Sequence, residues 1–181
     1  MRLIVLGKHR LRRWALDIVL MVLVVAGVYV WTQWRGASDV ATPATLPVLT
    51  LQKLDGQWVQ YHPGANQVTL INFWSTDCPP CIAEIPALNW LQQWFGGTGF
   101  TVLGVAVAGN TPQAIAAARS RFAMDYPLYA DKNGAAAQIL GGVTLTPTSL
   151  LINHKGQIVG RYVGAISLPV VVWRLLWMSH E

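Results

Sequence analysis

Beyond residue 47, the hydrophobic positions of the chain fall into short runs of strand length. Residues 68–74 and 100–108 are almost continuously apolar, which predicts two strands buried on both faces. A hairpin is expected around Asp55-Gly56, a strong two-residue turn signal, between strands at 49–54 and 57–61. The pattern predicts a short strand at 128–130 and a last hairpin, with strands at 149–153 and 158–163.

The remaining hydrophobic positions recur at helical spacing. Residues 82–95 and 167–178 each carry an apolar face, which predicts two amphipathic helices. Thr111-Pro112 is a cap and first-position pair, so a third helix is expected to run from there to about Met124. A short helix is expected at 133–140. Strands that alternate with helices and end in an antiparallel hairpin predict an α/β domain with a mixed sheet.

A long apolar segment precedes this domain. Residues 18–30 are unbroken apolar, and the span 14–34 is bracketed by tryptophans. A bilayer core takes roughly 20 residues of helix, with aromatic side chains at its interfaces. The alternatives are a cleaved signal peptide and an uncleaved signal anchor. Because no Ala-x-Ala cleavage site follows, the sequence favours an anchor at 14–34.

Charge sets the expected orientation of that anchor. The chain is 53% apolar and 12% charged, with a formal net charge of +5. Residues 1–13 hold five of the basic side chains, whereas from Arg35 onward 8 Lys+Arg stand against 7 Asp+Glu, a balance of +1. The net positive charge therefore belongs to the N-terminal residues, and the sequence gives little indication of nucleic-acid binding by the domain. The basic tail predicts a cytoplasmic N-terminus, a linker at 35–46 and an exported domain at 47–181, on the periplasmic face of a bacterial inner membrane.

The two cysteines, Cys78 and Cys81, stand at the junction of a buried strand and a helix. Thiol-disulfide exchange needs one accessible thiolate and a second thiol that resolves the mixed disulfide. We expect Cys78 at the helix N-cap as nucleophile, Cys81 one turn on as resolving thiol, and Pro79 and Pro80 in the first turn. The alternatives are a zinc site, for which no further ligands stand at suitable spacing, and a static disulfide, which would close a very short loop.

Residues 72–86 read Asn-Phe-Trp-Ser-Thr-Asp-Cys-Pro-Pro-Cys-Ile-Ala-Glu-Ile-Pro. This stretch resembles the active site of the TlpA/ResA-like family, and the similarity covers about residues 47–177, with Tyr129-Ala-Asp131 and the Thr-Pro-Thr at 146–148. Some details are similar to ScsD-type proteins linked to copper tolerance. The resemblance implies a thioredoxin fold with an N-terminal β-hairpin extension, and a membrane-anchored, periplasm-facing thiol-disulfide oxidoreductase.

The resemblance also implies roles for residues outside the cysteine pair. It makes Pro147 a cis proline facing the thiols, with Thr146 beside it as a clamp for an extended substrate segment. Without it, a trans proline at the start of an edge strand would be favoured. Glu84 matches the acidic residue that the family places near the active site, and we expect it to help move the proton of Cys81. The alternative is a first-turn carboxylate that interacts only with the helix dipole.

Asp77 departs from the family pattern, in which an aromatic residue often precedes the first cysteine. A carboxylate disfavours a neighbouring thiolate, and Pro79 and Pro80 remove amide donors, so these residues are expected to tune the pair toward donating electrons. Alternatively, Asp77 points into solvent and is screened. Trp74 is expected beneath the site, as a tuning residue or simply as a core aromatic.

These expectations combine into a protein that reduces disulfides of exported proteins, in the context of copper tolerance or cytochrome c maturation. No metal and no cofactor other than the redox-active Cys78–Cys81 disulfide is expected. Because the chain has no third cysteine, electrons must be exchanged with another protein, and the family suggests a DsbD/ScsB-type transmembrane donor. The alternative is a copper-binding chaperone that uses Cys78, Cys81 and His154 as ligands.

Overall fold

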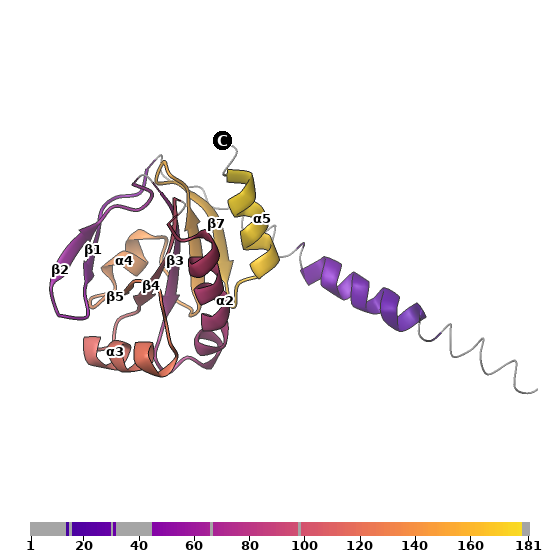
Figure 1. Ribbon diagram of the computed structural model, residues 1–181, viewed down its shortest axis with the longest axis horizontal. Helices are drawn as coiled ribbons and strands as arrows, with labels where there is room; N and C mark the ends of the chain where they lie inside the picture. Colours follow the sequence, from indigo (N-terminus) through magenta and orange to yellow (C-terminus); the bar gives the residue numbers. More distant parts are fainter. Residues whose placement is uncertain are drawn as a thin grey trace, which may run out of the picture.

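The computed structural model describes residues 14, 16–29, 31, 45–65, 67–97 and 99–178. Residues 16–29 are helical with exposed side chains (Figure 1). No helix within the described residues is both long and apolar enough to cross a bilayer. The predicted tail at 1–13, most of the linker at 35–46 and part of the predicted anchor at 14–34 lie outside the described residues.

The domain is built on one mixed sheet in the order β2-β1-β5-β4-β3-β6-β7. Strands β3, β4 and β5 are parallel, whereas β6 is antiparallel to β3 and to β7. At the other edge β1 pairs antiparallel with β2 and, through Gln52 and Ala130, with β5, which gives the expected hairpin extension. The strands are β1 (Leu49–Gln52), β2 (Trp58–Tyr61), β3 (Val68–Trp74), β4 (Phe100–Ala106), β5 (Leu128–Ala130), β6 (Thr148–Ile152) and β7 (Ile158–Val163).

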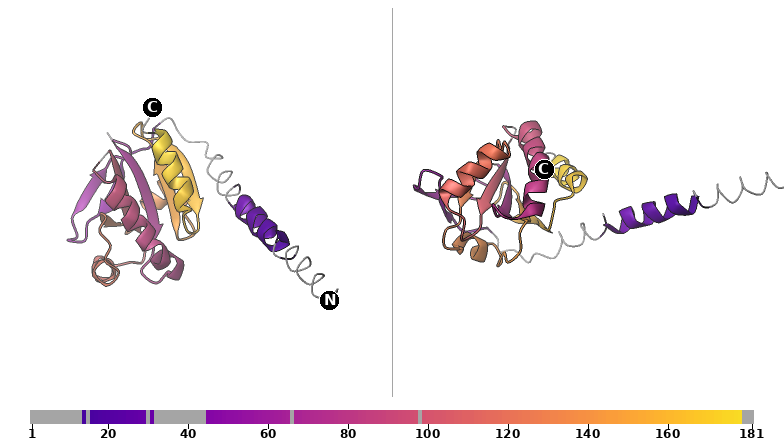
Figure 2. Two further views of the ribbon diagram at one scale, coloured as in Figure 1. Left: turned by 45° about the vertical axis from the view of Figure 1, so that its right-hand side comes forward. Right: turned by 90° about the horizontal axis from the view of Figure 1, so that it is seen from below.

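Helices cover both faces of the sheet, as Figures 1 and 2 show. Helices α2 (Pro79–Phe95), α3 (Pro112–Arg121) and α5 (Leu168–Met178) contribute to one apolar cluster, and α4 (Ala135–Ile139) contributes to a second cluster on the other face. Because β3 lies between the two clusters, all its residues after Val68 are buried, which explains its continuous apolar run.

For the predicted helix after Thr111, local sequence signals predict the start of the helix but not its end. The Thr111 hydroxyl accepts a hydrogen bond from the Ala114 amide at 3.2 Å, which confirms the cap. The helix ends at Arg121 rather than at Met124. Ala123 adopts a left-handed φ of 49°, and its carbonyl accepts a hydrogen bond from the Asn89 side chain of α2. A contact distant in sequence thus helps to fix this end.

The two ends of the sheet are distinct. Trp74, Ala106 and Ala130 are register partners at the carboxyl ends of the three parallel strands, and α2 starts shortly beyond them. At the opposite end Thr69 pairs with Ile152, so the β6–β7 turn at 153–157 lies beside the amino end of β3. The amide of Leu46 donates to the carbonyl of Gly156 in that turn at 2.9 Å. The chain therefore joins the domain at the end opposite to the start of α2.

Candidate active site

Cys78 and Cys81 form a disulfide at the start of α2, with their Cα atoms 5.3 Å apart. Cys78 is the N-cap residue of the helix and is partly exposed, while Cys81 is buried one turn on. The amide of Cys81 donates to Cys78 Sγ at 3.3 Å. Pro79 and Pro80 occupy the first two helical positions, as expected, and leave no earlier amide proton in the helix for that sulfur.

The loop that precedes the pair is held by Asn110, a residue that the sequence analysis did not single out. Asn110 Oδ1 accepts hydrogen bonds from the Thr76 amide at 3.0 Å and the Thr76 hydroxyl at 2.8 Å. Its amide group donates to the Val107 carbonyl at 2.9 Å. Asn110 thus connects the end of β4 to the loop after β3, and so positions the backbone that leads to Cys78.

Asp77 is exposed, next to the nucleophile. The Ser75 hydroxyl donates a hydrogen bond to its carboxylate, which lowers the pKa of Asp77 below its ordinary value. Asp77 is therefore ionised at neutral pH. A negative charge therefore lies next to Cys78 in the sequence, on a side chain exposed to solvent, and the tuning role of Asp77 stays a prediction.

Glu84 is buried beneath α2, and its two carboxylate oxygens are held from different directions. Oε1 accepts a hydrogen bond from Asn72 of β3 at 2.6 Å, and Oε2 accepts one from the Ile166 amide at 3.1 Å. Asn72 also donates to the hydroxyl of Ser149, its register partner on β6, at 2.9 Å. Burial raises the pKa of Glu84, and the two hydrogen bonds only partly oppose that effect. A buried carboxylate with a raised pKa holds its proton to a higher pH than an exposed glutamate does.

Two aromatic side chains pack beside this polar group. Trp74 and Tyr126 are almost fully buried and meet over Gly104, where an added Cβ would lie 2.9 Å from Tyr126 Cε2 and 3.4 Å from Trp74 Nε1. Burial and, to a lesser degree, the negative charge of Glu84 raise the pKa of Tyr126. Among the described residues, the Trp74 indole nitrogen and the Tyr126 hydroxyl have no hydrogen-bond partner. Trp74 therefore belongs to the core behind the cysteine pair.

The peptide bond between Thr146 and Pro147 is cis, as expected, while the role of the two residues as a substrate clamp stays a prediction. Thr148 pairs with Phe73 near the carboxyl end of β3, so Thr146 and Pro147 lie at the same end of the sheet as the start of α2. The Pro147 carbonyl accepts a hydrogen bond from the Gly164 amide at 2.8 Å. Because the same β7–α5 loop supplies the Ile166 amide to Glu84, this loop links the proline to the buried carboxylate.

The predicted copper-ligand set is not brought together. His154 lies in the β6–β7 turn, beyond the pairing of Ile152 with Thr69, whereas Cys78 follows the opposite end of β3. The four residue steps from Thr69 to Phe73 alone span about 13 Å. Within the described part of the chain, no group of three or more His, Cys, Asp or Glu side chains is arranged to hold a metal ion.

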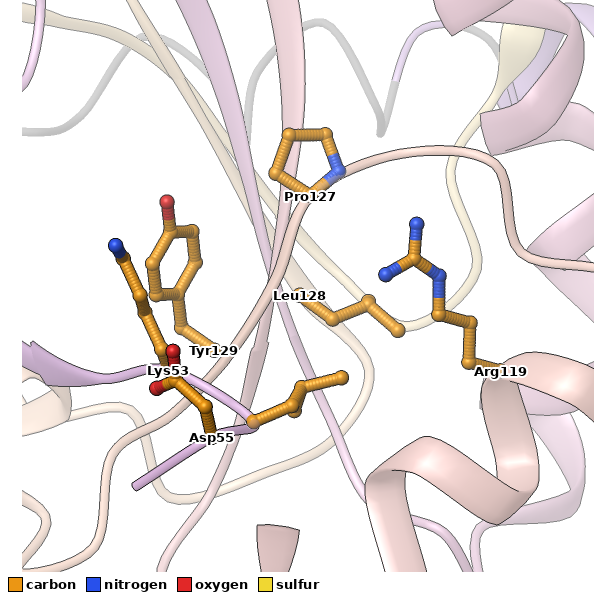
Figure 3. A pocket seen from close by; sticks show the side chains of 7 residues that line it. Lys53, Asp55, Arg119, Pro127, Leu128 and Tyr129 are labelled. Carbon is orange, nitrogen blue, oxygen red and sulfur yellow. The ribbon is translucent and has the colours of Figure 1, made fainter. Parts of the chain in front are cut away.

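A separate open hollow of about 290 Å³ lies between the β1–β2 turn, β5 and the last turn of α3 (Figure 3). None of its lining residues is a predicted site residue; they are Lys53, Leu54, Asp55, Arg119, Pro127, Leu128 and Tyr129. Figure 3 shows Lys53 and Tyr129 on one side of the hollow and Arg119 on the other.

The site residues that the sequence analysis missed are Asn72, Asn110, Tyr126, Ser149 and Ile166. Only Asn72 carried a signal, because a polar side chain interrupts the apolar run of β3. The others act through contacts between distant parts of the chain, so their local sequence gave no indication of them.

The fold and the site together define a thioredoxin-fold thiol-disulfide oxidoreductase. Helices cover both faces of a mixed sheet, the cysteine pair lies at the N-terminus of α2, and a cis proline lies at the same end of the sheet. Residues 41–170 match the Redoxin family. The chain belongs to that family and is of its TlpA/ResA-like type.

Two named relatives are similar to this chain over most of its domain. The chain is 29% identical over 122 residues to the thiol-disulfide oxidoreductase ResA of Halalkalibacterium halodurans, covering 67% of this chain and 68% of the relative. It is 25% identical over 162 residues to the thioredoxin-like protein YneN of Bacillus subtilis, covering 87% and 93%.

Solved structures of thiol-disulfide proteins are also similar to this chain. A thiol:disulfide interchange protein of Chlorobium tepidum superimposes with a TM-score of 0.62 at 26% identity, over 72% of this chain and 92% of the other. A secreted thiol-disulfide isomerase of Corynebacterium glutamicum gives a TM-score of 0.68 at 25% identity, over 75% and 86%.

Proposed function

We propose that this protein is a membrane-tethered reductase of disulfides in exported proteins, with Cys78 as nucleophile and Cys81 as resolving thiol. The observation that carries the proposal is the unequal exposure of the two sulfurs: Cys78 is partly exposed at the helix N-cap, and Cys81 is buried behind it. A substrate disulfide can therefore reach the first sulfur and not the second.

The reaction moves two electrons from the protein to its substrate. The Cys78 thiolate attacks one sulfur of the substrate disulfide, a mixed disulfide forms, and the other substrate sulfur leaves as a thiolate. Cys81 then gives up its proton and attacks Cys78 Sγ, which forms the Cys78–Cys81 disulfide and releases the second substrate sulfur. Glu84, one turn beyond Cys81 and with a raised pKa, is the proposed acceptor of that proton. Thr146 and Pro147 are the proposed clamp for the substrate backbone.

The surroundings of Cys78 support the direction of electron flow. In the helix, the first amide able to stabilise a Cys78 thiolate is that of Cys81, because Pro79 and Pro80 have none. The ionised Asp77 carboxylate adds an unfavourable charge. Weak stabilisation of the reduced, ionised form lowers the reduction potential, so the pair favours giving electrons away.

The membrane tether, location and partners belong to the same proposal. We place the anchor at residues 14–34, after the cytoplasmic tail at 1–13, and the domain in the bacterial periplasm. With no third cysteine in the chain, re-reduction of the disulfide requires another protein, for which a DsbD/ScsB-type donor fits. ScsD-type copper tolerance and cytochrome c maturation are the two proposed settings.

The reduction potential of the full-length protein in detergent tests the direction. The oxidised and reduced fractions are measured by thiol alkylation after equilibration in glutathione and dithiothreitol buffers. We expect a value well below that of the strong oxidant DsbA, roughly −120 mV. A value near that figure would show that the protein oxidises its substrates.

A further inference from the structure

Four tryptophans are exposed on α2 and α5, each at or beyond the middle of its helix. Their exposed fractions are 38% for Trp90, 65% for Trp94, 56% for Trp173 and 65% for Trp177. Trp90 and Trp94 also contact each other, with ring centroids 6.0 Å apart. Helices α2 and α5 lie side by side on one face of the sheet (Figure 2). The reaction described above does not use this surface.

Trp94 and Trp177, in the last turns of α2 and α5, lie toward one end of the domain, and Trp90 and Trp173 lie one turn before them. Both helices begin near the cysteine pair: α2 starts after Cys78, and Ile166, just before α5, bonds to Glu84. Arg174 of α5 donates to the carbonyl of Val159 at the start of β7, so α5 runs antiparallel to that strand. Phe95, at the end of α2, contacts Phe100, the first residue of β4. Trp94 and Trp177 therefore lie at the end opposite to the cysteines.

The chain also joins the domain at this end, through the hydrogen bond of Leu46 to Gly156. Between residue 34, where the proposed anchor ends, and Leu46 there are 12 residue steps. Fully extended, they reach at most about 40 Å. The tether therefore joins the domain at the end that bears Trp94 and Trp177, and its length limits how far this end can lie from the bilayer.

The chemistry of this end suits a lipid interface. Tryptophan has an apolar body and a polar N–H and concentrates at the boundary between hydrocarbon and headgroups. An exposed basic side chain, Lys155 in the β6–β7 turn, lies at the same end and suits anionic headgroups.

We propose that the end of the domain bearing Trp94, Trp173 and Trp177 rests on the membrane surface, where it holds Cys78 away from the bilayer. The inference rests on the proposed anchor, because the tether supplies the bilayer. The occupant of this surface is phospholipid headgroups and the upper acyl chains, rather than a second copy of the chain or a substrate protein.

Site-specific photocrosslinking of the full-length protein tests this contact. Trp94, Trp173 or Trp177 is replaced, one at a time, by p-benzoylphenylalanine, in nanodiscs of phosphatidylethanolamine and phosphatidylglycerol. Two matched positions serve as controls, Trp58 on β2 and Leu145 beside Thr146, which are 51% and 63% exposed. Mass spectrometry of the intact chain then detects phospholipid adducts.

We expect several-fold higher adduct yields at Trp94, Trp173 and Trp177 than at Trp58 and Leu145. Equal yields at all five positions, or crosslinks to a second copy of the chain, would overturn the docking surface. Vesicle flotation after carbonate extraction separates this failure from failure of the anchor. A chain that floats without selective adducts keeps its anchor and loses the docking surface, whereas a chain that does not float loses both.

Discussion

Glu84 carries a carboxyl group into the core one turn beyond Cys81. Its oxygens accept hydrogen bonds from Asn72 and the Ile166 amide, yet burial still raises its pKa. The position therefore has two consequences that can be measured separately, one for stability and one for the rate of the thiol chemistry.

The stability of the oxidised protein should fall as pH rises past the ordinary carboxyl value of 4.5. A raised folded-state pKa means that the protonated form of Glu84 favours folding. Its contribution is complete below 4.5 and is lost as pH rises through the folded-state pKa. Urea unfolding of wild type and Glu84→Gln across this range measures the effect. The difference in unfolding free energy between the two should depend on pH, and a constant difference would contradict the prediction.

Glu84→Gln should also slow closure of the Cys78–Cys81 disulfide from a mixed disulfide, by about 100-fold, the lower part of the range for a removed proton acceptor. Stopped-flow with a small-molecule mixed disulfide on Cys78 measures this step over a pH series. Ser149→Ala is the control, because it disturbs the hydrogen-bond partner of Asn72 and keeps the Glu84 carboxylate. An unchanged rate in Glu84→Gln would leave this residue with a structural role alone.

Asp77→Ala should raise the reduction potential, since removal of the negative charge favours the thiolate of Cys78. The side chain is exposed, so the rise should stay below roughly 30 mV, the change that corresponds to a tenfold shift for a two-electron couple. The alkylation assay in redox buffers measures it, with Asp125→Ala as an exposed control far from the pair. A potential that does not rise would remove Asp77 from the tuning residues.

At the scale of elements, the sequence predicts strands and helix caps correctly where the signal is local. The boundaries of β3 and β5 agree with the prediction, and Thr111 caps α3 as expected. The end of α3 could not be predicted, because the contact of Asn89 with Ala123 comes from another helix. In the site, the sequence shows Cys78 and Cys81 as a motif. Asn110 could not be predicted, because it binds Thr76 in the loop after a neighbouring strand and has no local sequence pattern.

Asn110→Ala should destabilise the oxidised protein by about 1–3 kcal/mol, because the Thr76 amide would lose its acceptor in a half-buried loop. It should also speed reduction by dithiothreitol, since the loop before Cys78 would be held less firmly. Urea unfolding and the rate of reduction measure the two effects. Gln113→Ala, exposed on α3, is the control and should change stability by less than about 0.5 kcal/mol.

At the scale of the whole molecule, the structured domain takes in Leu46. This side chain is buried in the cluster that contains α4, and its amide is bonded to the β6–β7 turn. The predicted boundary at residue 47 remains a prediction. The local sequence places Leu46 in the linker, because Pro47 and the small residues before it carry no signal of the long-range contact with Gly156.

Leu46→Ala should lower the free energy of unfolding by about 2–4 kcal/mol, as for other large apolar side chains removed from a core. Val48→Ala is the control: its side chain is more than one-third exposed, so the loss should stay below about 1 kcal/mol. Urea unfolding of both oxidised variants measures the two losses in unfolding free energy. Equal losses would mean that the chain before β1 does not contribute to the core.

Strand β7 forms one edge of the sheet, and its pairing with β6 is irregular between Leu151 and Ile152, which leaves Val159 without a register partner. The side chain of Arg174, on α5, donates a hydrogen bond to the carbonyl of Val159. A bulge in an edge strand, together with a charged side chain held against that strand, hinders the addition of a further strand. The contact that fastens α5 to the sheet therefore also guards the protein against aggregation, a hazard for any chain that must fold beside many others at high concentration.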